Sequence, residues 1–136
     1  MEITNFITAK EYLGMRESVG WSVFPEEEAQ MGLNNSYVVC IRDNDKPAAM
    51  GRIVWDHGYA VLIADVIVAP EYQGRGLGRL VMETIMNYIK EQLKPGYRIM
   101  VSLLAAHGKE DFYKKFGFIE RPNESFGPGM HQWLEN

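Results

Sequence analysis

The residues best suited to chemistry lie at positions 73–78, which read Gln-Gly-Arg-Gly-Leu-Gly. Glycine has no Cβ, so its backbone can approach a phosphate group closely. A long amphipathic pattern begins at this stretch, and the N–H groups in the first turn of a helix lack helical partners and attract anions. Arg75 and Arg79 can add charge-assisted contacts. The stretch therefore predicts an anion-binding loop at the N-terminus of a helix.

Two common phosphate-binding loops do not fit this stretch. A P-loop needs a Lys-Ser or Lys-Thr pair after its last glycine, and none is present. A dinucleotide-binding loop needs Gly-x-Gly-x-x-Gly, but the third glycine position falls on Arg79 or Val81 in the two registers available. Taken alone, the glycine pattern also leaves open a structural turn that binds nothing.

The elements that position this loop follow from the hydrophobic pattern around it. Short polar turns separate three β-rich runs, which predicts an antiparallel meander. The last of these runs, the helix after the loop and the next run form a strand-helix-strand unit, which predicts parallel pairing and hence a mixed sheet. The expected elements are a first strand within Met1–Ile7, helices after Thr8 and Pro25, strands at Ser36–Arg42, Ala48–Trp55 and Tyr59–Val68, a helix at Gly76–Leu93, a strand at Tyr97–Leu104, a helix at Lys109–Phe116 and C-terminal β segments at 117–119 and 130–134.

Composition limits the classes of protein that the sequence allows. The 136 residues suffice for one domain, and the net charge of -4 argues against nucleic acid or an anionic membrane as a partner. The single cysteine, Cys40, cannot form an internal disulfide and is expected to be a small buried hydrophobe. Residues 1–10 show no signal-peptide pattern, and no apolar stretch approaches the ~18 residues that span a bilayer. We therefore expect a cytoplasmic protein, and the histidine spacing suggests no metal site.

Two stretches carry a resemblance to a known family. Residues 73–78, preceded by Val-Ala-Pro-Glu-Tyr at 68–72, resemble the acetyl-CoA-binding motif of the GNAT superfamily of N-acetyltransferases. Residues 112–118, Phe-Tyr-Lys-Lys-Phe-Gly-Phe, are similar to the Tyr-x-Lys-x-Gly-Phe signature near the end of many GNAT domains. The resemblance is clear over 59–118. Residues 105–108 lack the asparagine that contacts the cofactor in many members of the family.

The resemblance, together with the element order, implies a fold and a set of site residues. The fold is α/β: a single GNAT-like domain over residues 1–136, with a central twisted mixed sheet of six to seven strands flanked by about four helices. Tyr113 would be the general acid that protonates the departing thiolate, although core packing of its ring remains an alternative. The implied cofactor-binding residues are Val66, Ile67, Val68, Gln73, Gly74, Arg75, Gly76, Leu77, Gly78, Arg79, Tyr113 and Lys115.

The reaction that the resemblance implies is direct attack of an amine on the thioester of acetyl-CoA, without metal. Ammonium cannot attack, so a base must remove a proton. Asp65 is the first candidate, with a structural role as the open alternative, and His107 is the second. Four aromatic residues, Trp21, Phe24, Tyr37 and Trp55, would either line the acceptor pocket or pack in the core.

The implied function is therefore an N-acetyltransferase that acts on a primary amine of a small molecule. Two alternatives stay open: an enzyme that acetylates a protein lysine or N-terminal amine, and an acyl-CoA-binding module without turnover. A homodimer that pairs through residues 127–133 is a further hypothesis.

Overall fold

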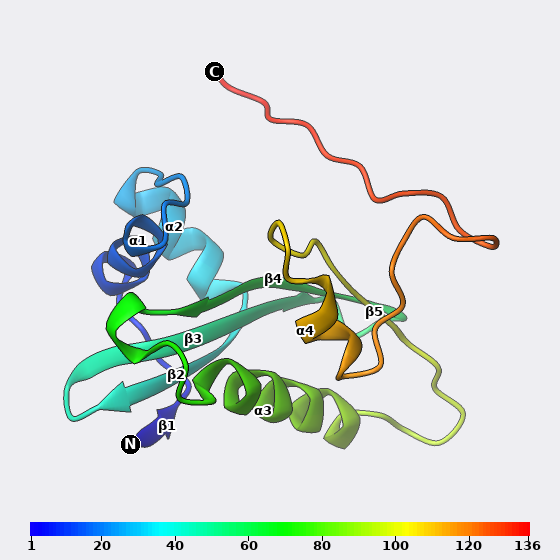
Figure 1. The fold of residues 1–136 in the computed structure, drawn as a ribbon, viewed down its shortest axis with the longest axis horizontal. Coiled ribbons are helices and arrows are strands. Elements are labelled where there is room, and N and C mark those ends of the chain that lie inside the picture. Colours follow the sequence, from blue (N-terminus) through cyan, green and yellow to red (C-terminus); the bar gives the residue numbers. More distant parts are fainter. The chain divides into compact units, whose positions relative to one another are not determined.

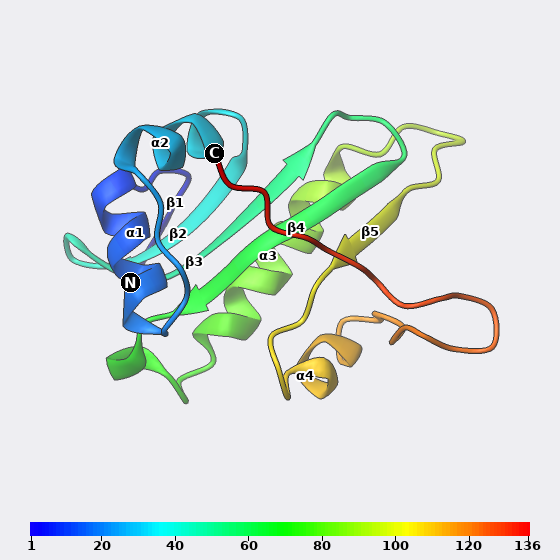
Figure 2. The same cartoon turned by 90° about the horizontal axis from the view of Figure 1, so that it is seen from above.

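The computed structural model describes all residues 1–136, which form two compact parts, Met1–Leu103 and Leu104–Asn136. The first part is an α/β sandwich of one sheet between helices, shown in two orientations in Figures 1 and 2. Its elements are β1 (Glu2–Thr4), α1 (Ala9–Ser18), α2 (Glu26–Asn34), β2 (Tyr37–Asp43), β3 (Lys46–Trp55), β4 (Ala60–Val68), the 3₁₀ turn η1 (Pro70–Tyr72), α3 (Leu77–Glu91) and β5 (Met100–Leu103). The second part contains α4 (Glu110–Lys114).

The sheet has five strands in the order β1-β2-β3-β4-β5. The first four strands pair antiparallel, and β5 pairs parallel with β4 after the crossover through α3. The predicted meander, crossover and mixed sheet are therefore confirmed. Helices α1 and α2 lie on one face of the sheet and α3 lies on the other (Figure 1).

Helix α3 buries one side of its surface against the middle strands. Its buried residues include Val81, Ile85 and Ile89, spaced four apart, as the amphipathic pattern predicted. Gly51 of β3 allows this close packing, because a Cβ at that position would lie 2.5 Å from Val81 Cγ1 and 2.6 Å from Ile85 Cδ1. The longest helix is α3, with 15 residues, and none of the helices combines the length and apolarity needed to cross a membrane.

The prediction of six to seven strands is not confirmed. The segments 117–119 and 130–134, expected to be strands, belong to no strand, and 118–136 contain neither helix nor strand. The polar groups of this stretch bond locally instead: Asn123 N–H donates to Phe126 O at 2.9 Å, and Arg121 Nε donates to Gly127 O at 2.6 Å. Local turn bonds of this kind compete with strand pairing.

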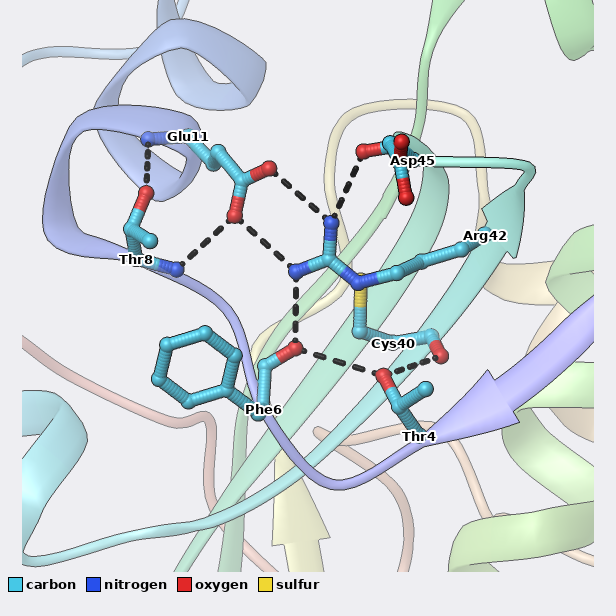
Figure 3. A network of polar contacts seen from close by, with 7 residues as sticks. All are labelled: Thr4, Phe6, Thr8, Glu11, Cys40, Arg42 and Asp45. Atoms are coloured by element: carbon cyan, nitrogen blue, oxygen red, sulfur yellow. Dashed lines mark hydrogen bonds and ion pairs between the residues drawn. The ribbon is translucent and has the colours of Figure 1, made fainter.

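The first turn of α1 is fastened to β2 by a charged network (Figure 3). Thr8 and Glu11 form a capping box, in which each side chain bonds the other residue's backbone N–H. The guanidinium of Arg42 donates to both carboxylate oxygens of Glu11, at 2.9 Å each, and also to Phe6 O at 3.1 Å. Beside this network Cys40 is fully buried and free, as expected.

The paired hydrogen bonds from Arg42 to Glu11 make the stability of the fold depend on pH. They lower the pKa of Glu11 from 4.5 to about 2. A lowered carboxyl pKa contributes stability above the unfolded value and loses it as the pH falls toward the folded value. We expect Glu11→Gln to cost about 2 kcal/mol of unfolding free energy near pH 7, and the difference from wild type to vanish between pH 4.5 and pH 2. Urea unfolding at several pH values measures this.

The matched control is Glu17→Gln, which changes an exposed carboxylate on the same helix. This variant should unfold like wild type at every pH. A pH-independent deficit in Glu11→Gln would contradict the ionic origin of the stabilisation.

Candidate functional site

Strand β4 has an open edge at its carboxyl end. It pairs with β3 as far as Val68, but β5 pairs with it only from Ala60 to Ile63. Ala69 N–H donates to Ala48 O at 2.9 Å, so by antiparallel alternation the peptide groups of Ile67 face β3, while those of Val66 and Val68 face the open edge. Such an edge can pair with an extended molecule that carries amides.

The glycine loop leads from β4 into an uncapped helix. Gly74 and Gly76 both have φ of 79°, a left-handed conformation that favours glycine. No side chain caps α3 at Gly76, and the first helical bond runs from Leu80 N–H to Gly76 O at 3.1 Å. The N–H groups of Leu77, Gly78 and Arg79 therefore have no helical acceptor.

This uncapped N-terminus has the features that an anion-binding site needs. A Cβ at Gly74 or Gly76 would meet no atom within 4 Å, so the space around the loop is open. Free N–H groups and the positive end of a helix dipole favour an anion there. Helix α1 lacks this property because Thr8 caps it.

The three long polar side chains of the loop, two arginines and one glutamine, differ in whether they already have a partner within the chain. Arg75 is exposed and its guanidinium lies over the ring of Tyr72, with 5.3 Å to the centroid. Arg79 is already paired, since its Nε lies 2.7 Å from Glu83 Oε1. Gln73 folds back onto β4, where its Nε2 donates to Val68 O at 3.1 Å. Arg75 is thus the loop cation best able to contact a phosphate.

Asp65, the first candidate base, lies in a buried ionic cluster. It is 4% exposed and accepts hydrogen bonds from Tyr12 Oη at 2.7 Å, Arg16 Nη1 at 2.8 Å and Arg52 Nε at 2.8 Å. Burial and the charge of Asp65 raise the pKa of Tyr12. A carboxylate with three donors is well placed to hold α1, β3 and β4 together, which is the structural role that the sequence left open.

Sequence reasoning missed the partners of Asp65. Tyr12 and Arg16 lie four residues apart on α1, which places them on one face of the helix, and Arg52 lies on β3. The only local signal was an arginine within the buried stripe of α1, and that signal names no partner.

The four aromatic residues proposed for an acceptor wall divide between the two faces of the sheet. Trp21 and Phe24 surround the guanidinium of Arg16, whose carbon lies 5.4 Å and 4.6 Å from their centroids. Tyr37 and Trp55 instead line a pocket of about 270 Å³ on the α3 side, where Tyr37 stacks on Tyr88 at 3.6 Å. The four residues therefore do not form one wall.

In the second part of the chain, Tyr113 lies on α4 among aromatic rings. Its ring centroid is 5.0 Å from that of Phe112 and 6.3 Å from that of Phe118. Burial raises the pKa of Tyr113, so the phenol stays protonated at neutral pH. Lys115 follows α4 and is exposed, as is His107 in the loop before it.

The structural and the catalytic role of Asp65 predict different results for the same substitution. We expect Asp65→Asn to lower the unfolding free energy by about 3–5 kcal/mol, because it leaves the buried guanidinium of Arg16 and the half-buried guanidinium of Arg52 without a counter-charge. Urea unfolding measures the change. The exposed Glu83→Gln is the control and should have little effect. A fully stable Asp65→Asn with no turnover would instead identify Asp65 as a base.

Comparison with known proteins gives consistent matches. Residues 34–120 match a family model described as acetyltransferase (GNAT) domain. An uncharacterized N-acetyltransferase of Pyropia yezoensis is 32% identical over 112 residues, which cover 79% of this chain and 62% of that protein. Its counterpart in Porphyra purpurea is 30% identical over 125 residues, which cover 88% and 70%. The chain thus spans roughly two thirds of these relatives.

Among solved structures, a probable acetyltransferase from meticillin-resistant Staphylococcus aureus is similar over almost its entire length. It is 35% identical, covers 98% of both chains and superposes with a TM-score of 0.86. No group of three or more His, Cys, Asp or Glu side chains lies close enough together to hold a metal ion.

Proposed function

Because this chain belongs to the GNAT family of acetyltransferases, we propose that it transfers an acetyl group from acetyl-CoA to a primary amine of a small molecule. The resemblance inferred from residues 73–78 and 112–118 is confirmed by the family match. The observation that carries the proposal is the uncapped N-terminus of α3, entered through two left-handed glycines directly after the open edge of β4.

The co-substrate would be held by backbone groups more than by side chains. In this proposal the N–H groups of Leu77, Gly78 and Arg79 bind the phosphates, and Arg75 adds a charge-assisted contact. The peptide groups of Val66 and the N–H of Val68 pair with the amides of the pantetheine arm and polarise the thioester carbonyl, while Val68 O accepts a bond from Gln73. Support for these roles comes from the missing cap and the missing strand partner.

The reaction would then proceed by direct attack. The neutral amine forms the new N–C bond as the C–S bond breaks, and its surplus proton leaves to a base or to water. Tyr113 donates its phenol proton to the departing thiolate. The raised pKa of Tyr113 supports this role, because a general acid must be protonated when the reaction begins.

We further propose that residues 1–136 act as a single catalytic domain. The family match at 34–120 runs across the boundary between the two parts, and the match to the Staphylococcus aureus structure covers both. Cofactor contacts from Lys115 and catalysis by Tyr113 both require this arrangement.

The identity of the acceptor rests on relatives. A protein of Oryza sativa, 29% identical over 119 residues, is named serotonin N-acetyltransferase, which favours a small amine. A protein of Glycine max, 29% identical over 118 residues, is named histone acetyltransferase, which favours a protein lysine as the second candidate. Screening small amines beside lysine peptides for thiol release separates the two.

The first test of the function is binding of the co-substrate. We expect calorimetric titration to show that acetyl-CoA binds the wild-type chain and that the double variant Arg75→Ala, Gly76→Ala weakens binding by roughly tenfold or more. A matched control is Arg98→Ala, Gly96→Ala, which removes an exposed arginine and a left-handed glycine beyond the other end of α3. Wild-type protein that binds no acetyl-CoA would refute the proposal.

The second test concerns turnover. We expect Tyr113→Phe to keep its affinity for acetyl-CoA and to lose kcat by about 100-fold to 1000-fold, because only the proton donor is removed. Because burial raises the pKa of Tyr113, wild-type activity should fall on the alkaline side only above pH 10. Steady-state kinetics across pH measure both effects. Binding without turnover in the wild type would instead indicate an acyl-CoA-binding module.

A further inference from the structure

The guanidinium of Arg75 lies against an aromatic ring. The glycines on either side of it place no side chain against the loop, and its guanidinium takes part in no ion pair or hydrogen bond within the chain. The guanidinium carbon lies 5.3 Å from the centroid of the Tyr72 ring. This separation is typical of a cation–π contact. Tyr72 therefore limits the directions in which Arg75 can point.

Tyr72 is in turn fixed by the turn between β2 and β3. It is 8% exposed, and its hydroxyl donates to Asp43 Oδ2 at 2.9 Å. On the other side of the turn, Lys46 pairs with Glu71, and its Nζ lies 5.6 Å from the centroid of the Tyr72 ring. The hydrogen bond to Asp43 raises the pKa of Tyr72, so its phenol stays a donor at neutral pH.

We propose that Tyr72 is a positioning residue for acetyl-CoA: its ring, held by Asp43, presents Arg75 to the phosphates of the co-substrate. The proposal rests on the proposed function and adds to it a residue outside the loop. A long side chain that is already directed loses less freedom when it binds, and affinity rises accordingly. The β2–β3 turn thereby becomes part of the support of the site, although neither Asp43 nor Lys46 needs to touch the ligand.

A merely structural role for Tyr72 predicts a different result. If Tyr72 only stabilised the fold, its loss would weaken the binding of every acyl donor alike. If Tyr72 acts through Arg75, its loss should weaken the binding only of donors that carry phosphates. S-acetylpantetheine has the same thioester and amides as acetyl-CoA but no phosphate, so it is a suitable second probe.

The experiment titrates both donors into the full chain and its variants, after urea unfolding has checked that each variant is folded. We expect Tyr72→Leu, which removes the ring, to weaken the binding of acetyl-CoA about fivefold to tenfold. Tyr72→Phe and Asp43→Ala, which keep the ring and remove its hydrogen bond, should weaken the binding of acetyl-CoA about twofold to threefold. None of the three should alter the affinity for S-acetylpantetheine. In steady-state kinetics the KM for acetyl-CoA should rise with kcat unchanged.

A double-mutant cycle with Arg75→Ala makes the result decisive. In the Arg75→Ala background, Tyr72→Leu should not lower the affinity for acetyl-CoA any further. Equal weakening of both donors, or an undiminished effect without Arg75, would overturn the positioning role while leaving the proposed function intact. Wild-type protein that binds neither donor would overturn both.

Discussion

The buried carboxylate of Asp65 is the interaction on which the arrangement of the first part depends. An ionised group out of contact with water must be paired, and this one accepts bonds from two guanidinium groups and a phenol. Those donors come from α1 and β3, while Asp65 lies on β4 immediately before the open edge. The cluster therefore joins the helical face of the sheet to the strand that is proposed to pair with the co-substrate.

Arg16 extends this cluster into the connection between α1 and α2. Its Nε donates to Ser22 O at 2.7 Å, and the rings of Trp21 and Phe24 pack against its guanidinium. One arginine thus satisfies the carboxylate and shapes the loop that follows α1. On the opposite face, α3 meets β3 without any charge, through the space that Gly51 leaves for Val81 and Ile85. The helices on the two faces of the sheet are therefore bound by different interactions: ionic contacts on the α1 face and dispersion on the α3 face.

The glycine loop lies where these two faces meet the end of β4. Its left-handed glycines let the chain turn from β4 into α3, and no atom lies within 4 Å of where a Cβ would stand at either glycine. Rigidity has to be supplied from elsewhere, and the β2–β3 turn supplies it through Asp43 and Tyr72. A site for a flexible anionic co-substrate benefits from this division, because the open backbone of the loop can bind the anion while the β2–β3 turn restrains the side chain of Arg75.

The sequence by itself determined the features that depend on near neighbours: the amphipathic face of α3, the meander before it, the glycine turn that leads into the helix, and the family. It did not determine the number of strands, because whether 117–119 and 130–134 pair depends on partners outside those segments. Nor did it reveal the donors to Asp65, which lie 53, 49 and 13 residues away along the chain. Charge pairing acts through space and leaves no period in the sequence, so only the tertiary structure decided which groups meet.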